Sequence, residues 1–380
     1  MNILHLTHTD INSDSRILKE MQSIATSSND YRVSGIGVIV DRGEKHTENI
    51  DNINIYSIVL RTRAWTFLPK VLRHSCSLIE LTSKMFFKSI KLKPKVIHCN
   101  DTLVLPLGVI VKAFTGAKLI YDAHELESDK NGLSKTLGKM TLYTEKILWR
   151  FIDALIVVSP SIDKWYKENI GEKYSEVILN APVLEKNPTV ISSDYLREYF
   201  SISNNSKIFL YVGGLVEGRG IELLIESFKN IDVKSSLVFL GYGILSDELK
   251  ETAKEYSNIY VHDAVSHEQV VSIARSADVG LCLIQNVSLS DYYCLPNKLF
   301  EYCFAEIPVL ASDFPDISAT VEKYNLGKCT ELNSESIYKV IKEFEVMDEL
   351  ESINADELYE LSWEAQEKKL IRLYDKMKER

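Results

Sequence analysis

Short apolar runs rich in β-branched residues alternate along the whole chain with longer segments of helical periodicity. Strands separated by helices form parallel sheets, and such strands are apolar throughout because helices cover both faces of the sheet. The pattern therefore predicts an α/β protein. The expected strands are 3–7, 33–40, 53–58, 96–99, 118–121, 154–158 and 176–179 in the first half, and 208–212, 237–240, 259–261, 279–284 and 309–311 in the second.

A loop-like stretch separates the two sets of strands. Residues 180–206 contain Pro182 and Pro188 and end in a Ser/Asn-rich tail, a composition typical of a domain boundary. A chain of 380 residues is also long enough for two domains with separate cores. We expect a hinge near 185–190 between two Rossmann-like domains, with a final helix that packs back on the first of them. The expected bounds are 1–187, 188–358 and, for the final helix, 359–380.

The composition, 45% hydrophobic and 26% charged, indicates a globular protein. Its six cysteines form no C-x-x-C pair, which favours a reducing compartment. The chain opens directly on a strand-like run without a basic and then apolar leader, and no stretch reaches the 18 or so apolar residues of a membrane span. We therefore expect a cytoplasmic protein.

The charge of the chain is unevenly distributed. A net charge of -10 disfavours binding to nucleic acid, which needs a clustered positive surface. Residues 61–95 nevertheless carry nine Lys or Arg against one acid, Glu80. Within this segment, 69–91 form an amphipathic helical pattern, which suits either a peripheral contact with anionic lipid or a core-packed helix with a solvated basic face. In the first case the protein would lie on the inner face of the plasma membrane.

A glycine-rich loop follows the expected strand 208–212. Its sequence, Gly213-Gly214-Leu-Val-Glu-Gly218-Arg219-Gly220, precedes an amphipathic helix. Such a turn presents backbone N–H groups and a helix N-terminus to an anion, and Arg219 adds a planar cation. The same glycines would also suit a simple tight turn. A second strand end carries Gly241 and Gly243, and together the two loops suggest one nucleotide cleft.

Two further segments carry ionisable groups beside expected strands. Asn297, Lys298 and Glu301 begin a helical pattern in which Lys298 and Glu301 share one face, so they either present a cation and a carboxylate to one ligand or form a surface ion pair. In the first half, Asp122 and His124 follow a strand, where α/β enzymes place site residues. Alternation makes their side chains point the same way, with either a structural or a functional role for His124.

These segments, in this order, resemble the family-4 retaining glycosyltransferases, also described as glycosyl transferases group 1. The resemblance covers nearly the whole chain, through Y-D-A-H-E-L at 121–126, G-G-L-x-x-G-R-G at 213–220, A-D-V-G-L at 277–281 and N-K-L-F-E-Y at 297–302. It implies the GT-B fold, in which two Rossmann-like domains face each other across the active site. It also implies transfer of a sugar from a nucleotide-diphosphate sugar, with retention at the anomeric carbon and without a metal ion.

By position, the resemblance implies that Arg219 and Lys298 neutralise the donor diphosphate, that Glu301 holds the ribose and that His124 contacts the transferred sugar. The family's usual pattern has a first Glu where this chain has Tyr293, and its loop begins Gly-Arg where this chain has Gly213-Gly214. One carboxylate and one cation are therefore missing, and Asp291 and Asn297 are candidates to replace the carboxylate.

The expected function is that of a hexosyl- or N-acetylhexosaminyltransferase acting on a glycan or lipid-linked acceptor, as in bacterial surface polysaccharide synthesis. A sugar-nucleotide epimerase or hydrolase of the same fold and a non-catalytic binder of sugar nucleotides are the alternatives. A nicotinamide dehydrogenase is disfavoured because the first strand leads into Thr7-His8-Thr9-Asp10 and lacks G-x-G-x-x-G. The base of the nucleotide is left open between uracil, guanine and adenine.

Overall fold

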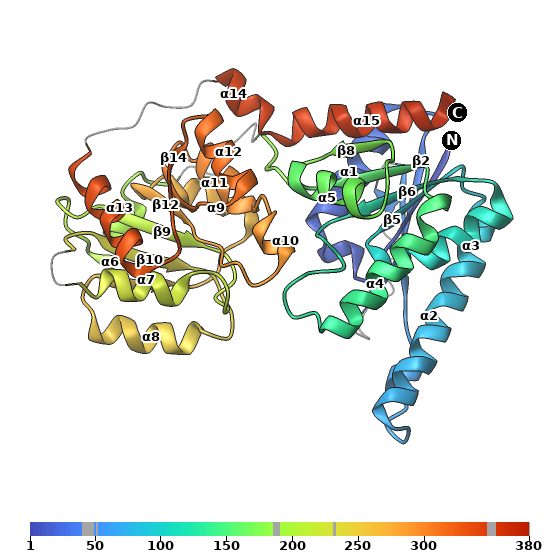
Figure 1. Ribbon diagram of the computed structural model, residues 1–380, viewed down its shortest axis with the longest axis horizontal. Helices are drawn as coiled ribbons and strands as arrows, with labels where there is room; N and C mark the ends of the chain where they lie inside the picture. The colour runs from blue at the N-terminus through green and yellow to red at the C-terminus, as the bar shows by residue number, and fades with distance from the viewer. Residues whose placement is uncertain (40–48, 51, 185–190, 231–232, 348–354, 380) are drawn as a thin grey trace. The chain divides into compact units, whose positions relative to one another are not determined.

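The computed structural model describes residues 1–39, 49–50, 52–184, 191–230, 233–347 and 355–379 (Figure 1). The chain divides into an N-terminal unit, Met1–Ile178 with Glu367–Arg380, and a C-terminal unit, Leu179–Gln366. The final helix α15 (Trp363–Glu379) thus begins in the second unit and continues in the first. The hinge expected at 185–190 lies outside the described residues.

The N-terminal unit is built on an eight-stranded sheet in the order β3-β4-β2-β1-β5-β6-β7-β8. β3 pairs antiparallel with β4, and the other described pairs are parallel. The order reverses between β1 and β5, and ligands of open parallel sheets bind at such a point, beyond the carboxyl ends of the strands. The strands are β1 (Asn2–Leu6), β2 (Arg32–Val38), β3 (Asn49–Ile50), β4 (Ile53–Ile58), β5 (Val96–Asn100), β6 (Lys118–Ala123), β7 (Ala154–Val157) and β8 (Ser175–Val177).

Helices connect these strands, and side-chain caps fix where several of them begin. Asp14, Ser134 and Ser159 each accept a hydrogen bond from a backbone N–H of the first turn of α1, α4 and α5. The helices are α1 (Ser15–Ser27), α2 (Lys70–Leu92), α3 (Leu105–Thr115), α4 (Lys135–Leu148) and α5 (Pro160–Asn169), and the short 3-10 turns are η1 (Ile11–Ser13), η2 (Thr62–Ala64), η3 (Thr102–Val104) and η4 (Trp149–Phe151).

The C-terminal unit contains a six-stranded parallel sheet in the order β11-β10-β9-β12-β13-β14, which reverses between β9 and β12. Its strands are β9 (Ile208–Val212), β10 (Ser236–Leu240), β11 (Ile259–His262), β12 (Val279–Cys282), β13 (Val309–Ser312) and β14 (Gly327–Thr330). Its helices are α6 (Tyr195–Phe200), α7 (Ile221–Phe228), α8 (Ser246–Glu255), α9 (His267–Ala274), α10 (Leu289–Tyr292), α11 (Asn297–Phe304), α12 (Pro315–Lys323), α13 (Ser334–Val346) and α14 (Ala355–Glu360).

Alternating residues of β9 fill two cores on opposite faces of this sheet. Leu210 and Val212 pack in one core with α9, α11 and α12, while Phe209 and Tyr211 pack in the other with α7 and α13. The strand is buried along its whole length, as the unbroken apolar run predicts. Each expected strand is present within a few residues. β3 and β14 were not predicted, and β14 (Gly-Lys-Cys-Thr) is a short edge strand with mixed polarity.

The amphipathic segment 69–91 forms α2, but its apolar residues do not form a core face throughout. Only Met85 and Ser89 of α2 are fully buried, whereas Val71 and Ile79 are 76% and 66% exposed. Figure 1 shows the first half of α2 projecting away from the sheet of its own unit. Among the described residues, no helix combines the length and the apolar character needed to cross a bilayer.

The tight fit between Gly280 and Tyr302 generates a stability prediction. A Cβ at Gly280 would lie 2.2 Å from Cγ of Tyr302, whose ring cannot move away because its hydroxyl is bonded to backbone groups on two strands. Gly280→Ala should therefore lower the free energy of unfolding by about 1–3 kcal/mol, measured by urea denaturation.

Gly214→Ala is the matched control, because the nearest atom to a Cβ there is 3.9 Å away. Its unfolding midpoint should equal that of the wild type. Equal midpoints for all three proteins would contradict the packing argument.

Candidate active site

The glycine-rich loop lies at the reversal point of the C-terminal sheet, directly after β9. Gly213, Gly218 and Gly220 all have positive φ, and Gly220 is the N-cap of α7. A Cβ at Gly220 would lie 2.8 Å from the backbone of Leu283, so glycine is required there by packing as well as by φ. Gly214 is different, because it is exposed and has open space around it. The fold of the unit does not require a glycine at 214, and the contact of Gly214 with the donor stays a prediction.

The second glycine pair supports this loop from behind. A Cβ on Gly241 would lie 1.9 Å from the carbonyl oxygen of Gly213, and one on Gly243 would lie 2.2 Å from that of Leu215. The two loops are also joined by hydrogen bonds, including one of 2.9 Å from Leu215 N to the carbonyl of Tyr242. Gly241 and Gly243 therefore allow the two loops to pack closely, and their predicted contact with the donor stays a prediction.

Lys298 lies against the loop from the start of α11. Its ammonium Nζ lies 3.6 Å from the point that a Cβ on Gly213 would occupy. It also lies 3.6 Å from the centroid of the Tyr211 ring. The ammonium is buried and has no hydrogen-bond partner among the residues that the structure describes. A buried ammonium normally pairs with an acid, because desolvating an unpaired charge costs several kcal/mol. The Tyr211 ring offsets part of that cost.

Tyr302, one turn further along α11, fixes the position of Lys298. Its hydroxyl donates to the carbonyls of Leu210 (2.9 Å) and Leu281 (3.2 Å) and accepts from Val212 N (3.0 Å). These bonds tie α11 to β9 and β12 at the point where the strand order reverses. Lys298 is thus directed toward the glycine loop by the backbone framework and not by an oppositely charged partner.

Arg219 is held by Asp291, from Nη1 to Oδ1 at 3.3 Å. Asp291 is buried in the first turn of α10, where it also accepts a 2.7 Å hydrogen bond from the N-cap residue Ser288. The sequence proposed Asp291 as a replacement for the missing carboxylate at Tyr293. In the structure Asp291 pairs with the loop arginine, and Tyr293 packs on Tyr292 at the end of α10. The role of Asp291 as a replacement stays a prediction.

The other predicted residues of α11 lie on the same helix. Asn297 is its exposed first residue, and Glu301 is buried with Oε1 3.4 Å from Nδ1 of His267 at the start of α9. The alternative of a surface ion pair between Lys298 and Glu301 is not seen in the described structure, where Glu301 interacts with His267, and their joint contact with a ligand stays a prediction. The interaction of Glu301 with His267 was missed in the sequence, because His267 lies 34 positions away and has no local pattern to mark it.

In the N-terminal unit, His124 follows β6 and lies beside Asp122, Nε2 to Oδ2 at 3.3 Å. The two side chains point the same way, as their spacing predicts. Burial disfavours the imidazolium, but the Asp122 carboxylate outweighs this and raises the pKa of His124 to about 9. Burial alone would raise the pKa of Asp122, but Arg16 and His124 together hold this pKa well below its usual value. At neutral pH His124 is a hydrogen-bond donor.

Asp122 belongs to a buried network behind His124. Arg16 lies 3.3 Å from its Oδ1 and 3.1 Å from Glu20, and His98 lies 3.3 Å from Oδ2. The other ring nitrogen of His98 is 2.7 Å from the hydroxyl of Tyr374 in α15. In the sequence, this network is marked only by Arg16 and Glu20 on the apolar face of α1 and by a histidine inside an apolar strand. Only the folded structure shows that these residues meet.

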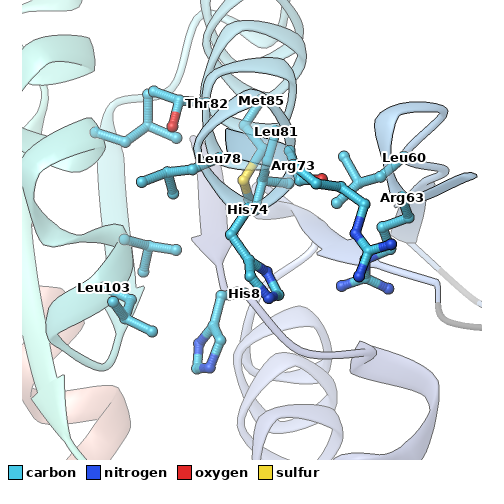
Figure 2. A pocket seen from close by; sticks show the side chains of 13 residues that line it. His8, Leu60, Arg63, Arg73, His74, Leu78, Leu81, Thr82, Met85 and Leu103 are labelled. Carbon is cyan, nitrogen blue, oxygen red and sulfur yellow. The ribbon is translucent and has the colours of Figure 1, made fainter. Parts of the chain in front are cut away.

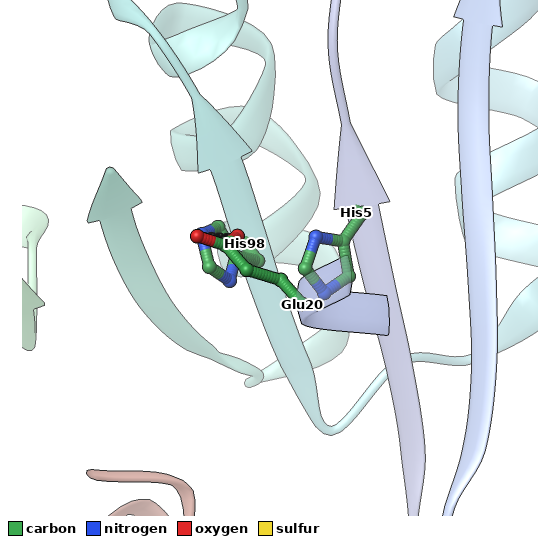
Figure 3. Close-up of side chains that lie close together, drawn as sticks. All are labelled: His5, Glu20 and His98. Carbon is green, nitrogen blue, oxygen red and sulfur yellow. Dashed lines mark ion pairs between the residues drawn. The ribbon is translucent and has the colours of Figure 1, made fainter. Parts of the chain in front are cut away.

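Three members of this network, His5, Glu20 and His98, place potential ligand atoms within 4.8 Å of one another (Figure 3). The group does not fit a metal ion, because the Arg16 guanidinium already lies 3.1 Å from Glu20 and would repel a second cation. Burial raises the pKa of Glu20 to about 8 and lowers that of both histidines. The cluster is therefore part of a buried electrostatic network.

Comparison with known proteins gives a family match within the C-terminal unit. The family model described as "Glycosyl transferases group 1" matches residues 193–353. The chain is 24% identical over 245 residues to the chitobiosyldiphosphodolichol beta-mannosyltransferase of Candida albicans, a match that covers 59% of this chain and 53% of that protein. The chain therefore spans about half the length of this relative.

Solved structures resemble the whole chain. Sucrose-phosphate synthase from Thermosynechococcus elongatus superposes with a TM-score of 0.77 at 16% identity, over 99% of each chain. Anabaena HepE in complex with UDP-glucose gives a TM-score of 0.73 at 14% identity, over 99% of this chain and 100% of that chain. At these identities the likeness shows the fold, which is GT-B with two Rossmann-like domains.

The raised pKa of His124 generates a pH prediction. Since the folded pKa of about 9 exceeds the unfolded value of about 6.5, the Asp122–His124 pair stabilises the protein fully below pH 6.5 or so and loses this effect as the pH rises through about 9. His124→Gln should cost about 2 kcal/mol at pH 6 and much less at pH 9.5.

The measurement is chemical denaturation of both proteins across that range, with exposed His74→Gln as the matched control. A difference between wild type and His124→Gln that stays constant with pH would show that Asp122 does not hold His124 as a cation.

Proposed function

We propose that this chain, which carries a domain of the glycosyl transferases group 1 family in residues 193–353, transfers a sugar from a nucleoside diphosphate sugar. The transferred group is a hexose or N-acetylhexosamine, with UDP as the first nucleotide to test. HepE, which shares the fold, is described in complex with UDP-glucose. The acceptor is a glycan or a lipid-linked sugar, and the setting is assembly of a surface polysaccharide at the inner face of the plasma membrane.

The observation that carries the proposal is the buried ammonium of Lys298. Within the described part of the chain it has no hydrogen-bond partner, and it lies against a glycine loop at the reversal point of a parallel sheet. A diphosphate bound there would supply the missing counter-charge and would also accept hydrogen bonds from loop N–H groups. The open space around Gly214 leaves room for such a ligand.

Arg219 supplies the second cation in this proposal. Its ion pair with Asp291 leaves the side chain one-third exposed, so it is oriented while its other N–H groups stay available. Arg219 and Lys298 together would neutralise the leaving diphosphate without a metal ion, and Glu301 would accept the ribose hydroxyls. Electrostatic stabilisation of a leaving group is commonly the largest contribution to such catalysis.

His124 would contact the transferred sugar as a hydrogen-bond donor. With a pKa of about 9 it is protonated at neutral pH, so it is not suited to accept the acceptor's proton. This supports retention, in which the leaving phosphate itself takes that proton and the protein contributes positioning. NMR of the product anomer tests the stereochemistry, and an inverted anomer would contradict it.

Tyr293 supports a second candidate, a non-catalytic binder of sugar nucleotides. A tyrosine stands where the family's pattern has a sugar-contacting carboxylate, and the nearby Asp291 is bonded to Arg219 and Ser288. This alternative predicts nucleotide binding without transfer to any acceptor. A sugar-nucleotide epimerase or hydrolase would instead convert the donor in the absence of acceptor, which incubation with donor alone detects.

Lys298→Met tests the central feature of the donor site. Methionine removes an unpaired buried charge and keeps the side-chain length, so the melting temperature without ligand should stay equal or rise. Stabilisation by UDP or a UDP-sugar should be lost, with affinity reduced at least tenfold. Thermal shift against a panel of nucleotide sugars measures both effects.

Lys339→Met is the matched control, because Lys339 forms an exposed ion pair with Glu335 on α13. It should leave ligand stabilisation unchanged. A Lys298→Met protein with the nucleotide response of the wild type would refute the donor site.

Arg219→Ala should weaken nucleotide affinity by about 10- to 100-fold, the effect of removing a charged hydrogen bond. It also leaves the buried Asp291 without its cation, so a lower melting temperature is expected. Arg219→Lys, measured alongside, keeps the charge and separates the two effects. Wild-type affinity in Arg219→Ala would assign diphosphate binding to Lys298 alone.

A further inference from the structure

A cavity of about 620 Å³ opens in the N-terminal unit between α2, η3 and the start of α3 (Figure 2). Its volume is within the range of pockets that hold small-molecule ligands. One end lies at the reversal point of the sheet, where His8 follows β1 and Leu103 follows β5. The cavity thus connects the ligand-binding edge of the N-terminal sheet with the basic segment 61–95.

The wall of the cavity is largely apolar. α2 contributes Leu78, Leu81 and Met85, and the chain after β5 contributes Leu103 and Leu107. Leu78 and Leu103 are 59% and 67% exposed, so these apolar side chains border the cavity without covering it. Isolated exposed leucines are ordinary, but a cavity bordered by several of them marks a site for an apolar ligand group.

The other side of the cavity carries positive charge. Figure 2 shows the guanidinium groups of Arg63 and Arg73 and the ring of His74 at the cavity, on a different side from Leu78 and Leu103. Neither arginine has an ion-pair partner among the residues that the structure describes.

The one acid of the segment, Glu80, is already occupied. It binds the ammonium of Lys84 at 2.5 Å and accepts hydrogen bonds from Thr62 and from the backbone of Arg61. Two other cations are also occupied, since Lys84 donates to the carbonyl of Val59 and Lys88 lies 3.5 Å from the centroid of the Tyr56 ring. Of the Lys and Arg side chains of the segment, those that line the cavity are Arg63 and Arg73, and His74 lies beside them.

His8 completes the inner end of the cavity. Its Nδ1 lies 2.6 Å from Oδ2 of Asp101, which follows β5 with φ of 76° and ψ of 170°. This backbone conformation is rare for residues other than glycine. The carboxylate hydrogen bond raises the pKa of His8 against the effect of burial and orients the ring.

We propose that this cavity binds a lipid phosphate, with the hydrocarbon chain against the leucines of α2 and the phosphate between Arg63, Arg73 and His74. This rests on the proposed glycosyl transfer, for which it specifies the acceptor class as a lipid carrying a phosphate or diphosphate. A free sugar phosphate would leave the apolar wall in water, whereas a neutral lipid would leave Arg63 and Arg73 without a counter-charge. The apolar side chains of α2 beyond the cavity, including Val71 and Ile79, extend the surface available to the chain.

The test is calorimetric titration of the full chain, without donor, with hexyl, octyl and decyl phosphate below their micellar concentrations. Affinity should rise about fourfold for each methylene until the cavity is filled. Arg73→Gln/His74→Gln should weaken decyl phosphate binding at least tenfold. These residues are exposed or partly exposed on α2, so the variant should fold, and its thermal shift with UDP should match the wild type.

Lys91→Gln/Lys95→Gln removes two cations from the same basic segment away from the cavity and should bind decyl phosphate as the wild type does. Equal loss in both double variants would overturn the proposal in favour of general attraction to anions. Binding of inorganic phosphate or decanol as strongly as decyl phosphate would also overturn it, as would binding to phosphatidylglycerol vesicles with no binding of monomeric alkyl phosphates. Absence of alkyl phosphate binding with an intact UDP response rejects the lipid site and leaves the proposed glycosyl transfer standing.

Discussion

The geometry of a parallel sheet decides where this protein can place chemistry. In each unit the strand order reverses once, between β1 and β5 and between β9 and β12. Connections on the two sides of a reversal leave toward opposite faces, so the loops after the two central strands separate and leave a crevice. Gly213 lies at one such point and the His8–Asp101 pair at the other. The candidate donor residues and the proposed lipid pocket follow from this one constraint.

Buried charge is compensated at Asp122 and uncompensated at Lys298. Asp122 is surrounded by Arg16, His98 and His124, so its charge is compensated and its neighbours are fixed in orientation. Lys298 is also held in a fixed position, through Tyr302, but no acid of the described chain compensates its charge. A compensated network stabilises the fold, whereas an uncompensated charge held by the framework costs stability until a ligand arrives. This difference is the physical basis on which Lys298 is proposed as a ligand-binding group.

Much of this architecture could be predicted because it is encoded locally. Unbroken apolar runs gave the buried strands, and the glycine loop and the Lys298 segment lie beside strands in the sequence itself. The edge strand β14 was missed because its residues are only partly buried, so apolar pattern cannot reveal it. The pairings of Arg219 with Asp291 and of Glu301 with His267 connect residues from different segments, and only the folded topology brings these together. The structural role of Gly241 could not be predicted from the sequence either, because it depends on how closely two loops approach each other.

The last helix has a consequence for how the protein folds during synthesis. Tyr374 is fully buried in the N-terminal unit against His98, although the rest of that unit ends at Ile178. Roughly 200 residues separate the two positions, so at ordinary elongation rates the ribosome needs about 10–40 s to deliver Tyr374 after the first unit has been made. During that time the C-terminal unit is synthesised while the His5 and His98 surface of the first unit lacks its cover. The N-terminal unit is thus completed last, although it is made first.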